Sequence, residues 1–378
     1  MKGVKNMKTG RKLYLDNIKW ITVVIVAIYH VFYMYNAEGI AGVVGKITNL
    51  DVQYYDIFQY FVYPWFMFLL VTISGMNSRF YLQNHTDKEF IRSRTRKLLV
   101  PSTIGLFVFQ WIQGYYNTRS SDAVNMMKTV PVFVAFLIMV ASGIGVLWYI
   151  QLLWVLSIIL VPIRKIEKDR LWNLGAKTGV VALLIMTAVV FGAAQILNTP
   201  IICVYRFGYY GAGFFIGYFV FSHDEVIERL KKWFVPLLII AIGLGVAFCI
   251  LYFPENYADA PVNRYILFTS YGWFATLAFL SGGAKYLDYT NPFLSWMSSH
   301  SWGLYVFHYL GISLIAHYIA RNALLPAWIT YILTLVSAFV TAYALYAIIS
   351  RIPFFRWAVL GIKGEKKIKD KDKEVAVV

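Results

Sequence analysis

Ten stretches of about twenty residues, each strongly apolar and nearly free of charge, limit most severely how this chain can fold. A helix of roughly 20 apolar residues crosses the hydrocarbon of a bilayer. Of the 378 residues, 59% are hydrophobic and 14% are charged, against ~45–50% and ~25% in soluble domains. We therefore predict an all-α polytopic membrane bundle of about ten transmembrane helices. The predicted spans are 18–36, 57–78, 98–115, 145–163, 178–197, 201–221, 234–253, 265–282, 302–320 and 327–349.

The Lys and Arg residues are distributed unevenly between the two sides that these spans define. With a cytoplasmic N-terminus, five lie in the outer loops: Lys46, Arg119, Lys128, Arg264 and Arg321. Lys19 and Arg206 lie within predicted spans, and all the others fall on the inner side. Cytoplasmic loops are enriched in Lys and Arg, so we predict that both termini are cytoplasmic. This layout explains the net charge of +16 by topology, and we expect no nucleic-acid partner.

The spans divide the chain into three parts. Residues 1–17 form a basic cytoplasmic N-terminus, 18–350 the transmembrane domain, and 351–378 a basic cytoplasmic tail. Between the fifth and sixth spans, 198–200 reads as a tight turn between helices. Apolar segment 131–142 is too short to span, and we expect it to be re-entrant or interfacial on the outer side. Gly213 and Gly217 predict close helix packing in the sixth span.

His30 is the sharpest chemical feature of the spans. No Asp or Glu lies well inside any predicted span, although coupled transporters commonly use such carboxylates. Lys19 lies eleven residues before His30, which places both on one helix face about 16 Å apart, and Asp16 lies one turn earlier. A neutral imidazole can accept a proton, as a general base must. The alternative is a polar residue satisfied between helices, with Lys19 reaching to the interface.

A second cluster, Arg92, Arg94 and Arg96, precedes the third predicted span. Guanidinium groups bind phosphates through paired donors, so this cluster could hold a phosphorylated donor. Its charge could equally do no more than set the topology.

Two aromatic motifs begin later spans. Trp148, Tyr149 and Gln151 open the fourth span, where an interfacial belt and a substrate lining are both open interpretations. Tyr305 and His308 lie in the ninth span, and their spacing is compatible with packing or with a place in a pocket.

The cysteines and histidines show no metal-ligand spacing, and we expect no metal site.

These four patterns, in this order, resemble the acyltransferase 3 family of integral membrane acyltransferases. The family's start is matched by Asp16, Lys19 and His30, and its second motif by the Arg-rich stretch that ends at 98–101. Its aromatic third motif resembles 147–149, and its late run ending in His resembles 301–308. The likeness covers about residues 11–350. Lys19 stands where the family usually has Arg, and a late intramembrane acidic residue has no clear counterpart here.

The resemblance implies a multi-pass enzyme of the plasma membrane that takes an acyl group, with acetyl expected, from cytoplasmic acyl-coenzyme A. The acceptor would be a hydroxyl of a cell-surface carbohydrate or a related molecule. Acyl-coenzyme A would be a substrate rather than a permanently bound cofactor, and membrane lipid, donor and acceptor would be the partners. The implied sites are His30 for catalysis, Asp16, Lys19, Arg92, Arg94 and Arg96 for the donor, and Trp148, Tyr149, Gln151, Tyr305 and His308 for the pocket.

The sequence leaves several alternatives open. His30 could act as a general base or could itself accept the acyl group and relay it, which would give ping-pong kinetics. A ten-span transporter or flippase would explain the topology equally well. A sensor or scaffold without activity is the third interpretation.

Overall fold

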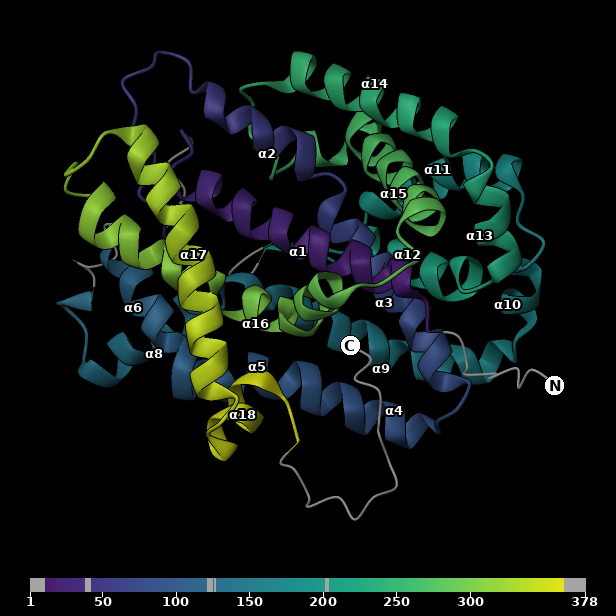
Figure 1. Ribbon diagram of the computed structural model, residues 1–378, viewed down its shortest axis with the longest axis horizontal. Coiled ribbons are helices and arrows are strands. Elements are labelled where there is room, and N and C mark those ends of the chain that lie inside the picture. The colour runs from purple at the N-terminus through teal and green to yellow at the C-terminus, as the bar shows by residue number, and fades with distance from the viewer. Residues whose placement is uncertain (1–10, 38–41, 121–124, 126, 201–203, 364–378) are drawn as a thin grey trace.

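The computed structural model describes residues 11–37, 42–120, 125, 127–200 and 204–363. Most of these residues are helical (Figure 1). The α-helices are α1 Leu13–Met34, α2 Ile57–Val62, α3 Phe66–Leu82, α4 Asp87–Arg94, α5 Val100–Ser102, α6 Trp111–Arg119, α8 Val132–Ser142, α9 Trp148–Glu167, α10 Arg170–Gly175, α11 Val180–Ala194, α12 Phe207–Ile216, α13 Asp224–Lys231, α14 Phe234–Tyr252, α15 Ile266–Tyr286, α16 Pro292–Ile315, α17 Ala327–Ile349 and α18 Pro353–Leu360.

Shorter helical turns join or extend these helices. Three are 3₁₀ turns: Tyr54–Asp56, Gly145–Leu147 and Val262–Arg264. Four are π-helical turns: Thr95–Leu99, Leu106–Gln110, Gly217–Phe221 and Ala316–Ala320.

Six helical segments in the described part of the chain are long and apolar enough to cross a membrane. They are Leu13–Met34, Tyr54–Leu82, Gly145–Glu167, Phe234–Tyr252, Pro292–Ala320 and Ala327–Ile349. They confirm an all-α multi-pass bundle and coincide with six predicted spans. The predicted span 265–282 lies in the 21-residue α15, whereas 98–115 is broken into short helical pieces. The full count of ten and the orientation of the termini stay predictions.

The predicted tight turn at 198–200 is wrong. A β-hairpin stands there instead, with β1 Asn198–Pro200 antiparallel to β2 Val204–Arg206 and Asn198 opposite Arg206. Helix α11 ends at Ala194, Leu197 then takes a left-handed φ of 54°, and Pro200 has no N–H to give to a helix. The next helix begins only at Phe207, so Arg206 lies in a strand rather than inside a span.

Helix α1 lies in the middle of the bundle, where it contacts α2, α3, α15, α16 and α17 (Figure 1). Helix α3 packs closely on α12 and the π turn that follows it. A Cβ added to Gly217 would strike the Thr72 carbonyl, and one added to Gly75 would strike the Phe214 carbonyl. This reciprocal approach confirms the close packing predicted for the Gly213 and Gly217 pair, because only small residues let the backbones come so near.

Two short helices complete the parts of the fold that matter for the site. Helix α8, from the apolar segment too short to span, packs on α6. Helix α18 lies in the region that the sequence assigns to a basic tail, yet Ala358, Val359 and Leu360 are buried. It packs on α5, and Trp302 Nε1 donates to the Leu360 carbonyl at 3.1 Å. The rest of the predicted basic tail, 364–378, lies outside the described residues.

Candidate active site

Two histidines far apart in sequence meet in the centre of the bundle. His30 lies near the end of α1, and His308 lies in the middle of α16. His308 Nε2 is 3.1 Å from His30 Nδ1, and the ring centroids are 5.1 Å apart. Contact between α1 and α16, which is extensive, brings the two rings together.

The backbone around each ring fixes its tautomer. His30 Nδ1 lies 2.8 Å from the Val26 carbonyl oxygen, and His308 Nδ1 lies 2.9 Å from the Leu304 carbonyl oxygen. Carbonyl oxygens only accept, so each neutral ring carries its hydrogen on Nδ1. The single hydrogen on His30 Nδ1 is then shared between the Val26 carbonyl oxygen at 2.8 Å and the lone pair of His308 Nε2 at 3.1 Å. The atom left with a free lone pair is His30 Nε2, which has no hydrogen-bond partner among the described residues.

His30 lines a cavity of about 650 Å³, within the range of roughly 300–1,000 Å³ typical of small-molecule sites. Aromatic residues are prominent in the wall, and its Tyr and Trp residues are Tyr29, Tyr33, Tyr63, Trp148, Tyr210, Tyr305 and Tyr309. Tyr29 and Tyr309 lie edge-on to the imidazole, with centroids at 5.1 and 5.2 Å. Asn117, Thr118, Ser142 and Asp259 add polar atoms. Such a wall suits a ligand with both apolar faces and hydroxyl groups.

The cavity lies toward one end of the bundle, which we call the cavity end. Its walls come from the last turns of α1 and α6, from α8 and from the start of α9. Helix α9 runs from Trp148 in this wall to Arg164, which forms an ion pair with Asp87 of α4 at 2.6 Å. We call the end that carries α4, with Arg92, Arg94 and Arg96, the basic end. Helices α3 and α9 both connect the two ends.

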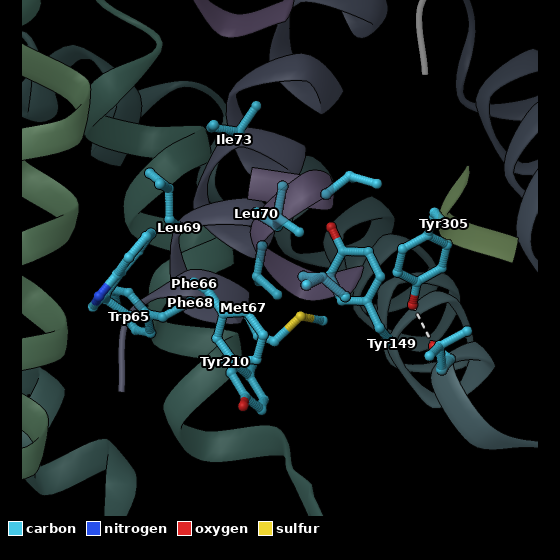
Figure 2. Close-up of a cluster of buried hydrophobic side chains, with 14 of the residues drawn as sticks. Trp65, Phe66, Met67, Phe68, Leu69, Leu70, Ile73, Tyr149, Tyr210 and Tyr305 are labelled. Carbon is cyan, nitrogen blue, oxygen red and sulfur yellow. Dashed lines mark hydrogen bonds between the residues drawn. The ribbon is translucent and has the colours of Figure 1, made fainter. Parts of the chain in front are cut away.

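The predicted pocket residues occupy different positions around the cavity. Trp148 and Tyr305 line it, whereas His308 lies behind His30. Tyr149 packs against Tyr305 with ring centroids 5.8 Å apart, beside Met67 and Leu70 (Figure 2). Tyr305 donates to the Val146 carbonyl (Figure 2). Gln151 lies outside the cavity wall, where it donates to the Ser102 carbonyl at 2.9 Å and accepts from Tyr205.

The three predicted arginines diverge instead of converging on one point. Arg92 is exposed, whereas Arg94 turns inward and donates to Ser78 Oγ at 3.1 Å. Burial lowers the pKa of Arg94 to about 10, so its guanidinium stays charged at neutral pH. Arg96 lies in the π turn Thr95–Leu99, and its buried Nε has no partner among the described residues. Such turns within helices are frequent at functional sites.

Asp16 is placed to neutralise neighbouring cations. Its two oxygens contact Lys19 Nζ at 2.8 Å and Arg11 Nε at 2.6 Å. The carboxylate therefore holds Lys19 in position at the start of α1, the helix that carries His30 near its other end.

A model of the acyltransferase 3 domain matches residues 12–347, nearly the whole chain. The chain belongs to the acyltransferase 3 family. No curated protein and no solved structure matches it significantly. Membership makes the protein an acyltransferase, and the six apolar spans make it a multi-pass membrane enzyme. Membership therefore favours the enzyme over the transporter and scaffold interpretations.

The sequence did not single out two further residues at the candidate site. Arg206 is 3% exposed and donates to Tyr63 Oη at 2.9 Å and to the Ala258 carbonyl, both on cavity-lining residues. Asn117 joins three elements, because it donates to the Ser142 carbonyl at 3.2 Å and accepts from Ser313 Oγ at 2.9 Å. A lone cation between apolar stretches was the available signal for Arg206. Nothing in the sequence pattern marks Asn117.

Proposed function

We propose that this acyltransferase moves an acyl group, most simply acetyl, from cytoplasmic acyl-coenzyme A to a hydroxyl of a cell-surface carbohydrate or a related acceptor. The proposal rests on one observation above all. His30 lines an aromatic-rich cavity, and its Nε2 has no hydrogen-bond partner among the described residues, while its Nδ1–H is shared between the Val26 carbonyl and His308. This arrangement resembles the support that the acid of a catalytic triad gives its histidine, with a neutral imidazole in place of a carboxylate.

In the direct route, His30 Nε2 takes the proton of the acceptor hydroxyl as the hydroxyl oxygen attacks the thioester carbonyl. The carbonyl carbon forms a new bond to that oxygen, and its bond to the coenzyme A sulfur breaks. The sulfur leaves as a thiolate and recovers the proton. While His30 is cationic, its Nδ1–H bond to His308 Nε2, 3.1 Å long in the resting state, stabilises the charge.

In the relay route, His30 Nε2 attacks the thioester carbonyl and the bond from that carbon to the coenzyme A sulfur breaks. The thiolate takes the remaining ring proton and leaves as the thiol before the acceptor reacts. The acyl-imidazole then passes the group to the acceptor hydroxyl, and the proton of that hydroxyl returns to the histidine. Both routes use the same atom. Their kinetics differ, because only the relay gives a ping-pong pattern.

The donor is proposed to reach the cavity from the basic end. The positive-inside rule favours a cytoplasmic basic end, where coenzyme A is found. A chain of contacts leads inward from Arg94 through Ser78 and Ser74 to the Tyr149 hydroxyl, which lies 3.2 Å from Ser74 Oγ. Tyr149 packs on Tyr305 in the cavity wall. We propose that these two rings separate the donor's entry from the acceptor cavity and move apart when the acyl arm enters.

The test is transfer of a labelled acetyl group from acetyl-coenzyme A by the intact protein in lipid nanodiscs. Mass spectrometry of cell-surface glycans and lipids, with and without the gene, supplies the acceptor. A His30→Gln variant keeps a hydrogen-bonding side chain but has no basic nitrogen, so transfer should fall by about 10²–10⁴.

His300→Ala is the matched control, since His300 lies on the same helix as His308 but outside the cavity wall. It should transfer normally. A His30→Gln variant that still transfers at the parental rate would show that the reaction does not use this histidine.

A further inference from the structure

Helix α18 adds a residue to the basic end that lies beyond the part of the chain matched by the family model. That match ends at residue 347, and α18 begins at Pro353. Figure 1 shows α18 beside α5, with α4 extending away from them. Contacts between α18 and α5 bear out this placement.

The end of α18 is held tightly against the arginine segment. Gly361 caps the helix with a left-handed φ of 65°. A Cβ added there would lie 2.5 Å from the Arg96 carbonyl oxygen and 2.8 Å from Lys97 Cα, so the two backbones touch. Ile362 N donates to the Arg356 carbonyl at 3.2 Å, which ties Arg356 to the same turn.

Arg96 and Arg356, on adjoining elements, share a feature that Arg79 and Arg264 show elsewhere in the described chain. Each is half-buried, and each has a buried Nε with no hydrogen-bond partner among the described residues. Neither forms an ion pair with any described carboxylate, whereas the nearby Arg164 is paired with Asp87. A buried donor that loses water without gaining a partner is costly, and a bound anion removes that cost. Two guanidiniums on adjoining elements suit phosphate oxygens in particular.

We infer that Arg96 and Arg356 form a phosphate-binding subsite for the nucleotide part of the acyl donor. This inference rests on the proposed function, which supplies a donor with several phosphates. It adds a specificity-determining residue, Arg356, from a helix that the sequence assigns to a tail. Phosphate on an anionic lipid headgroup has the same chemistry, so the experiment must separate the two sources.

The experiment measures the dissociation constant of coenzyme A for the intact protein in phosphatidylcholine nanodiscs. Arg356→Ala should weaken binding about tenfold, as expected for one lost charged hydrogen bond. Arg356→Lys should recover part of the loss and shows whether the fold is kept, because it retains the charge. Arg351→Ala is the control, since Arg351 is exposed and precedes α18; its affinity should stay within about twofold.

Two further arms identify the phosphate. The Arg96→Ala and Arg356→Ala losses should not add in the double variant, because both residues hold one ligand. The same titration with 3′-dephospho-coenzyme A shows which phosphate is bound. If it is the 3′-phosphate, Arg356→Ala no longer lowers the affinity. If it is the diphosphate, Arg356→Ala still lowers the affinity.

Unchanged coenzyme A affinity in Arg356→Ala, with binding of phosphatidylglycerol reduced or unaltered, would overturn the inference. If Arg94→Ala weakens binding in the same assay, the proposed function survives that result. Parental protein that binds no coenzyme A would contradict the proposed function itself.

Discussion

The two ends of the bundle differ in how the nitrogen atoms of their histidines and arginines are hydrogen-bonded. At the cavity end, His30 and His308 form a hydrogen-bonded pair, and His30, which lines the cavity, keeps an Nε2 without a partner among the described residues. At the basic end, Arg92 and Arg94 diverge. Arg96 and Arg356 each have a buried Nε without a hydrogen-bond partner among the described residues. The first arrangement suits the activation of one atom. The second suits a large anion that brings its own acceptors, so chemistry and donor binding are expected to separate by mutation.

His308→Phe should have the largest effect that leaves donor binding intact. Phenylalanine fills the space but offers no lone pair to the Nδ1–H of His30, so neither the tautomer nor the developing charge is supported. We expect kcat to fall about 100-fold, within the range that proton-transfer groups contribute. The dissociation constant of coenzyme A should stay unchanged. A steady-state assay combined with a binding titration separates the two quantities.

His308→Gln tests whether the role is chemical or only structural. Its amide oxygen can accept from His30 Nδ1–H, so we expect partial recovery of kcat. If the Phe and Gln variants are equally impaired, or if both are fully active, the pairing of the two histidines does not support catalysis.

Arg94→Ala should have the next largest effect. It should change the dissociation constant of coenzyme A and not kcat. The guanidinium is charged at neutral pH and contacts Ser78 on the proposed donor route. We expect the affinity for coenzyme A to fall about 30-fold, as for a charged hydrogen bond and its neighbouring phosphate contact. Arg119→Ala, a matched loss of charge on α6 near the cavity end, should bind coenzyme A normally. Equal effects of the two variants would reduce the basic end to a topology signal.

Trp148→Ala should affect the acceptor instead of the donor. Trp148 lines the cavity and packs on Tyr210 with ring centroids 5.5 Å apart. Loss of this aromatic surface should raise the KM for the acceptor about tenfold, since such contacts contribute roughly 0.5–1.5 kcal/mol. The affinity for coenzyme A should not change. A change in donor affinity alone would place Trp148 on the donor route.

Lys19→Arg should have the smallest effect. Asp16 accepts from Lys19 at 2.8 Å, and an arginine can make the same ion pair. We expect the affinity for coenzyme A to change by less than about threefold, since partly exposed ion pairs of this kind contribute little. A gain much larger than that in the same titration would mean that Lys19 contacts donor phosphates directly and that the missing bidentate fork weakens binding.

The sequence predicted the parts of the molecule that local pattern determines. Length and hydropathy located the six long spans, and helical periodicity with the family's motif order singled out His30. The pairing of His30 with His308 could not be predicted from the sequence. The two residues are 278 positions apart, and only the packing of α1 on α16 brings them together. His308 was named as a pocket residue without that contact.

Other features depended on backbone detail that composition does not report. Arg92 and Arg94 are two residues apart on α4, a spacing that turns side chains to different faces, and Arg96 lies beyond them in the π turn Thr95–Leu99. The basic composition after residue 350 concealed the short apolar α18, whose burial depends on contacts with α5. Pro200 and Leu197 gave a hairpin where separation alone suggested a tight turn.

The most direct test measures coenzyme A binding and acyl transfer side by side in His30→Ala. The cavity that His30 lines is distant from the basic end, where we place donor binding. The variant should therefore bind coenzyme A with the parental dissociation constant. It should transfer at least about 10²-fold more slowly, because no other base is placed at that atom. Two results would contradict the claim that catalysis lies at the cavity end and donor binding at the basic end. One is transfer at the parental rate by His30→Ala, and the other is a loss of coenzyme A affinity large enough to account for the lost transfer.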